Sequence, residues 1–194
     1  YGCVSRYGLV DLSMSLDQIG PLANNVKDAA LVLDVIKGKD ERDTTTLTFE
    51  SEKIEIKKNG NITLGIVSVK HTDKQVQKVI DDTVRSLIER NSWKSKNIEI
   101  KYIDLAIGTY HLIVWTEFFS ATRRFDGRKY AKKIEDSAGP EVLRRIFGGS
   151  EISKAEFEGR YYHKALQVKE LIKQEFEVAL KNVDCIIMPT VPVL

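Results

Sequence analysis

The sequence contains little cysteine, no long apolar run and no excess of charge of one sign. Its 194 residues include only Cys3 and Cys185, too few and too far apart for a disulfide framework or a zinc site, which is typical of a reducing compartment. No apolar run approaches the roughly 20 residues of a membrane span. The net charge of +2 lacks the concentrated positive field of a nucleic-acid-binding domain. We therefore expect a soluble, cytoplasmic protein without a membrane partner.

The sequence also lacks a catalytic motif that spacing alone would reveal. Ser13 and Ser15 do not lie in a Gly-x-Ser-x-Gly elbow, and no nucleophile–base pair can be named. The three histidines have no cysteine or acidic residue at metal-ligand spacing. Gly148 and Gly149 are too few for a phosphate-binding loop and instead predict the end of a helix. We predict neither a catalytic residue nor a metal site in these 194 residues.

The two ends of the sequence are unusual for a complete domain. The first residue is Tyr1 rather than methionine, and no polar lead-in precedes the Gly-punctuated stretch that follows. The last residues, Met188–Leu194, follow a predicted strand and stop before another element begins. Because a complete domain buries its own sheet edges, we interpret residues 1–194 as a single incomplete segment of a longer protein. A processed but complete domain is the alternative.

Strands and helices alternate along the chain. Apolar residues at helical spacing predict a helix from Asn25, its N-cap, to Gly38. A strand at 62–67, a helix capped by Asp73 and a strand at 98–103 predict a β-α-β unit with parallel strands. The remaining predicted elements are a weak strand at 53–57, helices at 107–125, 139–147 and 153–182, and a final strand at 185–188. We expect an α/β fold with a mixed, mostly parallel sheet flanked by helices.

One predicted helix carries two charges on the same face. Steps of three and four residues align Glu117 with Arg124, about 10 Å apart along the axis, so each needs another partner. The planar guanidinium of Arg124 suits a carboxylate ligand. Alternatively, Arg124 neutralises the C-terminal end of its helix dipole, with Gly127 as terminator. The spacing leaves both interpretations open.

The long helix near the C-terminus also carries an acidic residue on its apolar stripe. Glu175 lies three residues after Ile172 and four after Leu171, whereas Glu177 lies off the centre of the stripe. Two partners suit its carboxylate: the ammonium group of a substrate, or an arginine of the fold in an internal salt bridge.

Seven short motifs follow one another along the chain: Tyr1–Leu9, Ser15–Pro21, Asp28–Ala30, Asp40–Asp43, Arg124–Gly127, Leu171–Phe176 and Met188–Pro192. Taken together and in this order, they resemble the amidase signature family, and within it the A subunits of the amidotransferases for glutamyl-tRNA(Gln) and aspartyl-tRNA(Asn). The Ser-Leu-Asp-Gln-Ile-Gly-Pro run is typical of the wider family, and the Arg-Phe-Asp-Gly run is typical of the amidotransferases. The resemblance covers essentially the whole chain.

The resemblance implies an amidase signature fold and a glutaminase. Such proteins hydrolyse glutamine with a serine, a second serine joined by a cis peptide bond, and a lysine. The ammonia then passes to the kinase (B) subunit, which uses ATP and magnesium to activate misacylated tRNA, and the small (C) subunit supports the pair. None of the three catalytic residues matches a position in this sequence. The resemblance therefore implies a C-terminal part that lacks the catalytic N-terminal part, holds no cofactor and is inactive alone.

Substrate recognition is the role that the resemblance does assign to this chain. Arg124 matches the arginine that holds the α-carboxylate of glutamine. Glu175 matches the acidic residue that holds the α-ammonium group, although the family has aspartate there, and Glu177 is the neighbouring alternative. Glu117, on the same predicted helix face as Arg124, is the third candidate for substrate binding.

Two other functions are compatible with the same residues. In the first, the chain is part of a different amidase signature hydrolase that acts on simple amides. In the second, it is a catalytically silent module that docks the other subunits or tRNA. The basic cluster at 128–133 is either a solvated face or a contact for tRNA phosphate. The sequence does not distinguish glutamyl-tRNA(Gln) from aspartyl-tRNA(Asn) as the final substrate.

Overall fold

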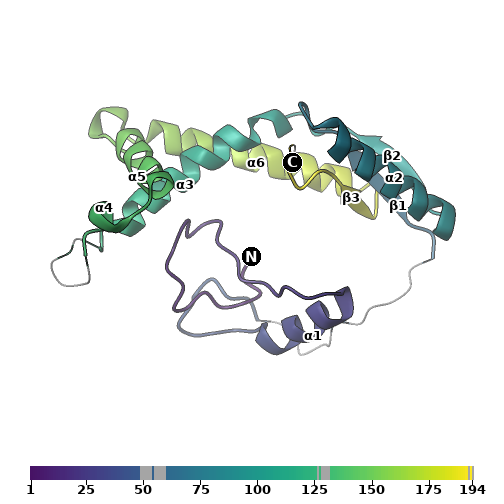
Figure 1. Cartoon of the computed structure of the whole chain (residues 1–194), viewed down its shortest axis with the longest axis horizontal. Coiled ribbons are helices and arrows are strands. Elements are labelled where there is room, and N and C mark those ends of the chain that lie inside the picture. Colours follow the sequence, from purple (N-terminus) through teal and green to yellow (C-terminus); the bar gives the residue numbers. More distant parts are fainter. Residues whose placement is uncertain (49–53, 55–59, 126, 128–131, 192, 194) are drawn as a thin grey trace. The chain divides into compact units, whose positions relative to one another are not determined.

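The computed structural model describes residues 1–48, 54, 60–125, 127, 132–191 and 193 (Figure 1). The chain divides into two compact units, and each unit is built from two separate stretches of sequence. The first unit comprises residues 1–57 and 112–159, and the second comprises residues 58–111 and 160–194. The chain therefore passes from one unit to the other at 57/58, at 111/112 and at 159/160.

A parallel sheet organises the second unit. Its strands, in the order β2-β1-β3, are β1 (Thr63–Val67), β2 (Lys94–Ile98) and β3 (Cys185–Ile187). The helix α2 (Lys74–Asn91) connects β1 with β2, and the side chain of Asp73 caps it by accepting a hydrogen bond from the Gln75 amide. The predicted β-α-β unit and the α/β fold with a mostly parallel sheet flanked by helices are confirmed.

The apolar core of the second unit packs against this sheet. Val67 of β1, Ile100 and Ala179 of α6 (Arg160–Leu180) are buried together. Partly buried side chains that pack against them are Ile98, Ile103, Phe176, Ile186 and Met188. The strand predicted at 98–103 is wrong, because Ile100 follows β2 and residues Ile103–Leu105 form the 3-10 helix η1. β2 itself is largely exposed and polar, so it lacks the apolar alternation that reveals a half-buried strand.

The regular elements described in the first unit are helices, and residues 1–25 and 37–48 are irregular. Its elements are α1 (Val26–Ile36), the part of α3 (Ala106–Thr122) from Leu112 onward, α4 (Ile134–Ser137), α5 (Pro140–Ile152) and the 3-10 helix η2 (Ala155–Phe157). The side chain of Asn25 accepts a hydrogen bond from the Asp28 amide, which confirms the predicted N-cap. α1 ends at its C-cap Lys37, which is extended, and the following Gly38 has a φ of +146°, a conformation that favours glycine.

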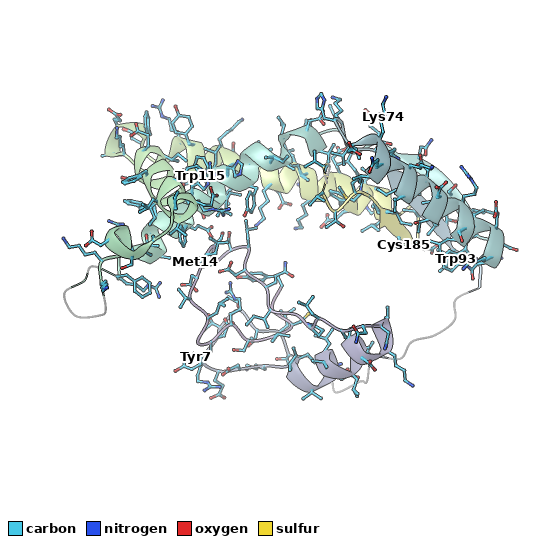
Figure 2. The ribbon with its side chains drawn as sticks, in the orientation of Figure 1. Tyr7, Met14, Lys74, Trp93, Trp115 and Cys185 are labelled. Atoms are coloured by element: carbon cyan, nitrogen blue, oxygen red, sulfur yellow. The ribbon has the colours of Figure 1, made fainter. Side chains whose placement is uncertain are left out.

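Two predicted helix boundaries are wrong, for different reasons. α5 does not end at Gly148 but continues through both glycines to Ile152. The two glycines are needed instead for contact with α3. Trp115, labelled in Figure 2, is the α3 residue that the two glycines approach. A Cβ at Gly148 would lie 2.5 Å from Cε3 of Trp115, and one at Gly149 would lie 2.0 Å from the Trp115 carbonyl oxygen. The glycines therefore permit close approach of α5 to α3.

The predicted helix at 153–182 begins later than the periodicity indicates. Glu158 and Gly159 have φ values of +50° and +71°, which interrupt the helix, and α6 begins at Arg160. The weak strand predicted at 53–57 lies outside the described residues except for Ile54.

Candidate functional site

Arg124 follows the last residue of α3 by two positions. Its Nε donates a hydrogen bond to the Ala121 carbonyl oxygen at 3.0 Å, and its Nη2 donates to Oδ2 of Asp11 at 3.1 Å. The first contact satisfies a carbonyl near the end of α3, as the helix-dipole interpretation expects. The second pairs the guanidinium with a carboxylate of the chain itself, and the Arg124 side chain is 57% exposed. Binding of a ligand carboxylate by Arg124 stays a prediction.

Glu117 lies deeper than Arg124, in the interior of the first unit. Its side chain is 7% exposed, and its Oε2 accepts hydrogen bonds from the Ser13 hydroxyl at 2.6 Å and from the Ser15 amide at 3.0 Å. Because these groups belong to the chain itself, the burial of Glu117 does not require a ligand. Substrate binding by Glu117 stays a prediction.

Residues 11–17, which we call the α3-facing loop, supply hydrogen-bond partners to two charged residues, Glu117 and Arg124. The loop is also fixed internally. Oδ2 of Asp17 accepts hydrogen bonds from the Leu12 and Ser13 amides at 2.9 and 3.0 Å, and the Asp17 amide donates to the Ser13 carbonyl. Sequence patterns missed this loop as part of the site, because its contacts with Glu117 and Arg124 join residues more than 100 positions apart.

Glu175 belongs to the second unit, on α6. It is half-buried, and its Oε2 accepts a hydrogen bond from the Lys101 amide at 3.3 Å. Glu177 is exposed, and its Oε1 lies 3.6 Å from Nζ of Lys173. The structure thus separates the two acidic candidates as the apolar stripe predicts, with Glu175 facing the protein and Glu177 facing solvent.

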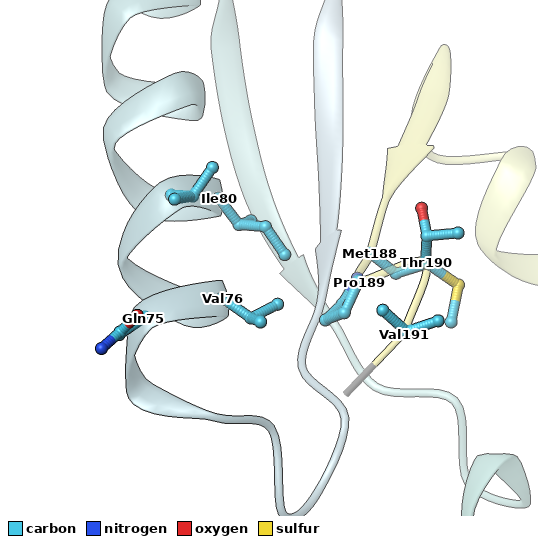
Figure 3. Close-up of a pocket in the computed structure, with 8 residues that line it drawn as sticks. Gln75, Val76, Ile80, Met188, Pro189, Thr190 and Val191 are labelled. Carbon is cyan, nitrogen blue, oxygen red and sulfur yellow. The ribbon is translucent and has the colours of Figure 1, made fainter. Parts of the chain in front are cut away.

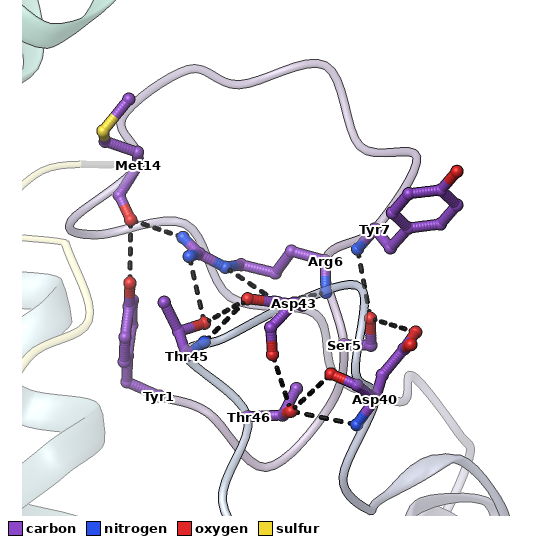
Figure 4. A network of polar contacts seen from close by, with 9 residues as sticks. All are labelled: Tyr1, Ser5, Arg6, Tyr7, Met14, Asp40, Asp43, Thr45 and Thr46. Atoms are coloured by element: carbon purple, nitrogen blue, oxygen red, sulfur yellow. Dashed lines mark hydrogen bonds and ion pairs between the residues drawn. The ribbon is translucent and has the colours of Figure 1, made fainter.

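A polar network ties the N-terminal stretch to residues 40–46 in the first unit (Figure 4). Oδ1 of Asp43 accepts a hydrogen bond from the Thr45 hydroxyl at 2.7 Å, and Oδ2 accepts from the Arg6 amide at 2.8 Å. These bonds, the Thr45 hydroxyl bond first, lower the pKa of Asp43 from 3.8 to about 2. The Arg42 side chain, with the Ser5 hydroxyl, likewise lowers the pKa of Asp40. The network is structural, since each carboxylate is satisfied within the chain.

The lowered pKa of Asp43 predicts a loss of stability in acid. Because the folded state favours the carboxylate more than the unfolded state does, Asp43 stabilises the fold above its ordinary pKa of 3.8. That contribution disappears as the pH falls from about 4 towards about 2. Urea unfolding followed by circular dichroism over this range should show a falling midpoint, and Asp43→Asn should flatten the dependence. Asp82→Asn, at an exposed ion pair of the second unit, serves as the control.

Two cavities of the second unit share a wall formed by Met188, Pro189 and Thr190, which follow β3. One, of about 360 Å³, lies against α2 and is mostly apolar (Figure 3). The other, of about 630 Å³, is also lined by Lys70 and Asp104, whose side chains form an ion pair. The larger cavity lies at the carboxyl ends of β1 and β3, where parallel α/β sheets commonly bind small molecules.

Over the part of the chain that the structure describes, no three histidine, cysteine or acidic side chains cluster closely enough to hold a metal ion. In the same residues, no helix combines the length and apolar character that crossing a membrane would need.

Comparison with known proteins finds similarity along the entire chain. The protein family described as Amidase matches residues 1–194. The A subunit of glutamyl-tRNA(Gln) amidotransferase from Methanocaldococcus jannaschii is 47% identical over 100% of this chain and 44% of its own length. The crystal structure of the corresponding A subunit from Thermotoga maritima matches with a TM-score of 0.75 and 32% identity, over 100% of this chain and 41% of that one. An amidase crystal structure shares the fold, with a TM-score of 0.76 at 19% identity over 99% of this chain and 39% of that one. The chain thus spans less than half the length of these relatives.

Proposed function

Because the chain belongs to the amidase family, we propose that it forms part of the glutamine-hydrolysing A subunit of a tRNA-dependent amidotransferase. The observation that carries this proposal is the 47% identity, over the full length of the chain, to the A subunit of glutamyl-tRNA(Gln) amidotransferase from Methanocaldococcus jannaschii. Other solved structures, among them an amidase at 19% identity and an allophanate hydrolase at 20% identity, are similar in fold, so they support the fold but not a substrate.

In the proposed reaction, glutamine is hydrolysed to glutamate and ammonia by a Ser-cisSer-Lys centre that lies outside these 194 residues. The ammonia amidates glutamyl-tRNA(Gln) or aspartyl-tRNA(Asn) in the cytoplasm, together with a kinase (B) subunit that uses ATP and magnesium and a small (C) subunit. The role of this chain is to recognise glutamine. Ammonia release from glutamine by the purified 194-residue chain, without a metal ion, would contradict this division of roles.

For Arg124 we propose a contact with the α-carboxylate of glutamine. The Nε bond to the Ala121 carbonyl orients the guanidinium, and Nη2 already accommodates one carboxylate, that of Asp11. The side chain is exposed enough for a ligand to reach it. A fork of N–H donors that is oriented beforehand loses less entropy when it binds a carboxylate than a flexible ammonium does.

For Glu175 we propose, from the resemblance, a contact with the α-ammonium group of glutamine. Its carboxylate is half-buried and accepts a hydrogen bond from the Lys101 amide, which fixes its position but leaves acceptor capacity on its oxygens. The exposed Glu177 lacks such an anchor among the described contacts and pairs instead with Lys173.

The substitution Arg124→Lys tests the proposed function. Lysine keeps the charge but loses the fork, so we expect glutamine binding to weaken about tenfold or more, in line with the strength of charge-assisted hydrogen bonds. NMR titration of the 194-residue chain with glutamine, and with the α-amide of glutamine, measures the effect. The substitution should lower the affinity for glutamine and leave the affinity for the α-amide unchanged, because the α-amide lacks the carboxylate that Arg124 is proposed to bind.

Arg85→Lys is the matched control, since Arg85 also forms an exposed ion pair with an aspartate, Asp82, but belongs to the second unit. Equal glutamine affinities of the Arg124→Lys variant and the unmodified chain would reject Arg124 as the carboxylate site.

A further inference from the structure

We propose that Asp11 is a built-in competitor for the substrate carboxylate and so sets the affinity of Arg124 for ligands that carry one. This inference rests on the proposed function of Arg124. Asp11 lies in the α3-facing loop, and its Oδ2 accepts a hydrogen bond from Nη2 of Arg124 at 3.1 Å. The carboxylate of an amino-acid ligand is the same chemical group, and it seeks the same donors.

The donors of Arg124 are limited in number and partly committed. A guanidinium has five N–H groups. In the described contacts, Nε is held by the Ala121 carbonyl, and Nη2 is engaged by Asp11. A ligand that binds in the bidentate manner typical of arginine uses two parallel N–H groups. It must therefore either displace Asp11 or bind beside it.

Exposure makes the displacement feasible. The side chains of Arg124 and Asp11 are 57% and 26% exposed. Ion pairs in contact with water contribute little to stability, because solvent screens the attraction and two side chains lose freedom. An incoming carboxylate can therefore exchange with Asp11 without disrupting a buried charge pair.

The α3-facing loop does not depend on Asp11 for its position. Glu117 holds the Ser13 hydroxyl and the Ser15 amide, and Asp17 holds the Leu12 and Ser13 amides. These hydrogen bonds remain when Asp11 is changed. The Asp11 carboxylate can therefore affect ligand affinity although it is not needed to hold the loop in place. Its effect is electrostatic: it partly neutralises Arg124 and repels a second carboxylate brought close to it.

The substitution Asp11→Asn separates charge from shape. Asparagine keeps an oxygen that can accept the Arg124 hydrogen bond but removes the negative charge. We expect glutamine to bind the 194-residue chain about two- to fivefold more tightly, the range that the strength of exposed ion pairs implies. Binding of the α-amide of glutamine should not change, and the gain for glutamine should shrink at high salt.

Three further forms make the result specific. Asp82→Asn removes the same charge from an exposed arginine pair of the second unit and should leave glutamine binding unchanged. Asp11→Ser removes the charge with a smaller side chain and should show the same direction as Asp11→Asn, with circular dichroism to verify folding. In the double variant Asp11→Asn with Arg124→Lys, the gain should be lost.

The possible failures are distinguishable. Glutamine binding that depends on Arg124 but is the same with and without the Asp11 charge would overturn this inference and leave the proposed function standing. A gain that is equal for glutamine and its α-amide would also overturn it, because a loosened loop rather than charge would then explain the change. Absence of glutamine binding in every form would overturn the role of Arg124 and this inference with it.

Discussion

Alanine at position 149 is expected to destabilise the first unit by about 3 kcal/mol, the upper part of the range for overpacked interiors. Helix propensity alone favours alanine over glycine by about 1 kcal/mol inside a helix. The contact decides the sign, because the new Cβ would lie 2.0 Å from the Trp115 carbonyl oxygen and 2.6 Å from Cβ of Phe119. Neither atom can rotate away, so α5 and α3 must move apart. Urea unfolding followed by Trp115 fluorescence, in a Trp93→Phe background, measures the loss.

Gly108→Ala is the matched control for Gly149→Ala, because Gly108 is also helical, within α3. Among the described residues nothing lies within 4 Å of a Cβ added there. The same methyl group should therefore stabilise the protein by up to about 1 kcal/mol, through helix propensity and a less flexible unfolded chain. If the two substitutions shift stability in the same direction, close approach of the helices is not the reason for Gly149.

The second large effect is expected for Glu117→Ala, at about 3 kcal/mol of destabilisation. Each hydrogen bond to a charged group contributes about 1.5–3 kcal/mol, and a buried donor left unpaired adds a penalty. The substitution removes the acceptor of the Ser13 hydroxyl and of the Ser15 amide, and Ser13 is 1% exposed. Chemical denaturation measures the loss. Amide hydrogen exchange should in addition show faster exchange at Ser15.

Glu117→Gln is the control for Glu117→Ala, because it keeps the volume and one acceptor oxygen but removes the charge. We expect it to cost about 1–2 kcal/mol, in line with the difference between charged and neutral hydrogen bonds. An unchanged denaturation midpoint for Glu117→Ala would mean that the α3-facing loop is held by its internal bonds alone.

The parts of the fold that the sequence predicts correctly depend mostly on local patterns. The N-caps at Asn25 and Asp73 and the apolar spacing of the helices depend on neighbours within one or two turns, and the structure confirms them. The strand at 94–98 could not be predicted in this way. Among the described strands β2 lies at one side of the sheet, and four of its five residues are exposed, so no buried face imposes an alternating pattern on its sequence.

The glycines of α5 show why local reading fails inside a packed unit. A glycine pair signals a helix end when only the chain itself is considered, since glycine has low helix propensity. At Gly148 and Gly149 the deciding partner is Trp115, more than 30 residues away, and no spacing rule connects them. Tertiary packing thus outweighed propensity.

The candidate site likewise contains residues that a local motif identifies and residues that only long-range contacts reveal. Arg124 was identifiable from its motif, and its contact with the α3 terminus follows from its position two residues beyond the helix. Asp11, Ser13 and Ser15 were not identifiable as partners, because chain segments about 100 residues apart meet there. A sequence pattern can indicate that a buried charge needs a partner, but it does not say which one.

The interleaving of the two units constrains how a ribosome can produce this protein. Residues 1–57 emerge first, yet their unit also needs residues 112–159, and the sheet of the other unit needs β3 near residue 185. The first unit therefore lacks its second stretch until residue 159 has been synthesised, after the whole first stretch of the second unit, in contrast to the usual domain-by-domain order. Leu64 and Val67 of β1, which are buried in the finished fold, stay without the partner strand β3 until residues 185–187 have left the ribosome.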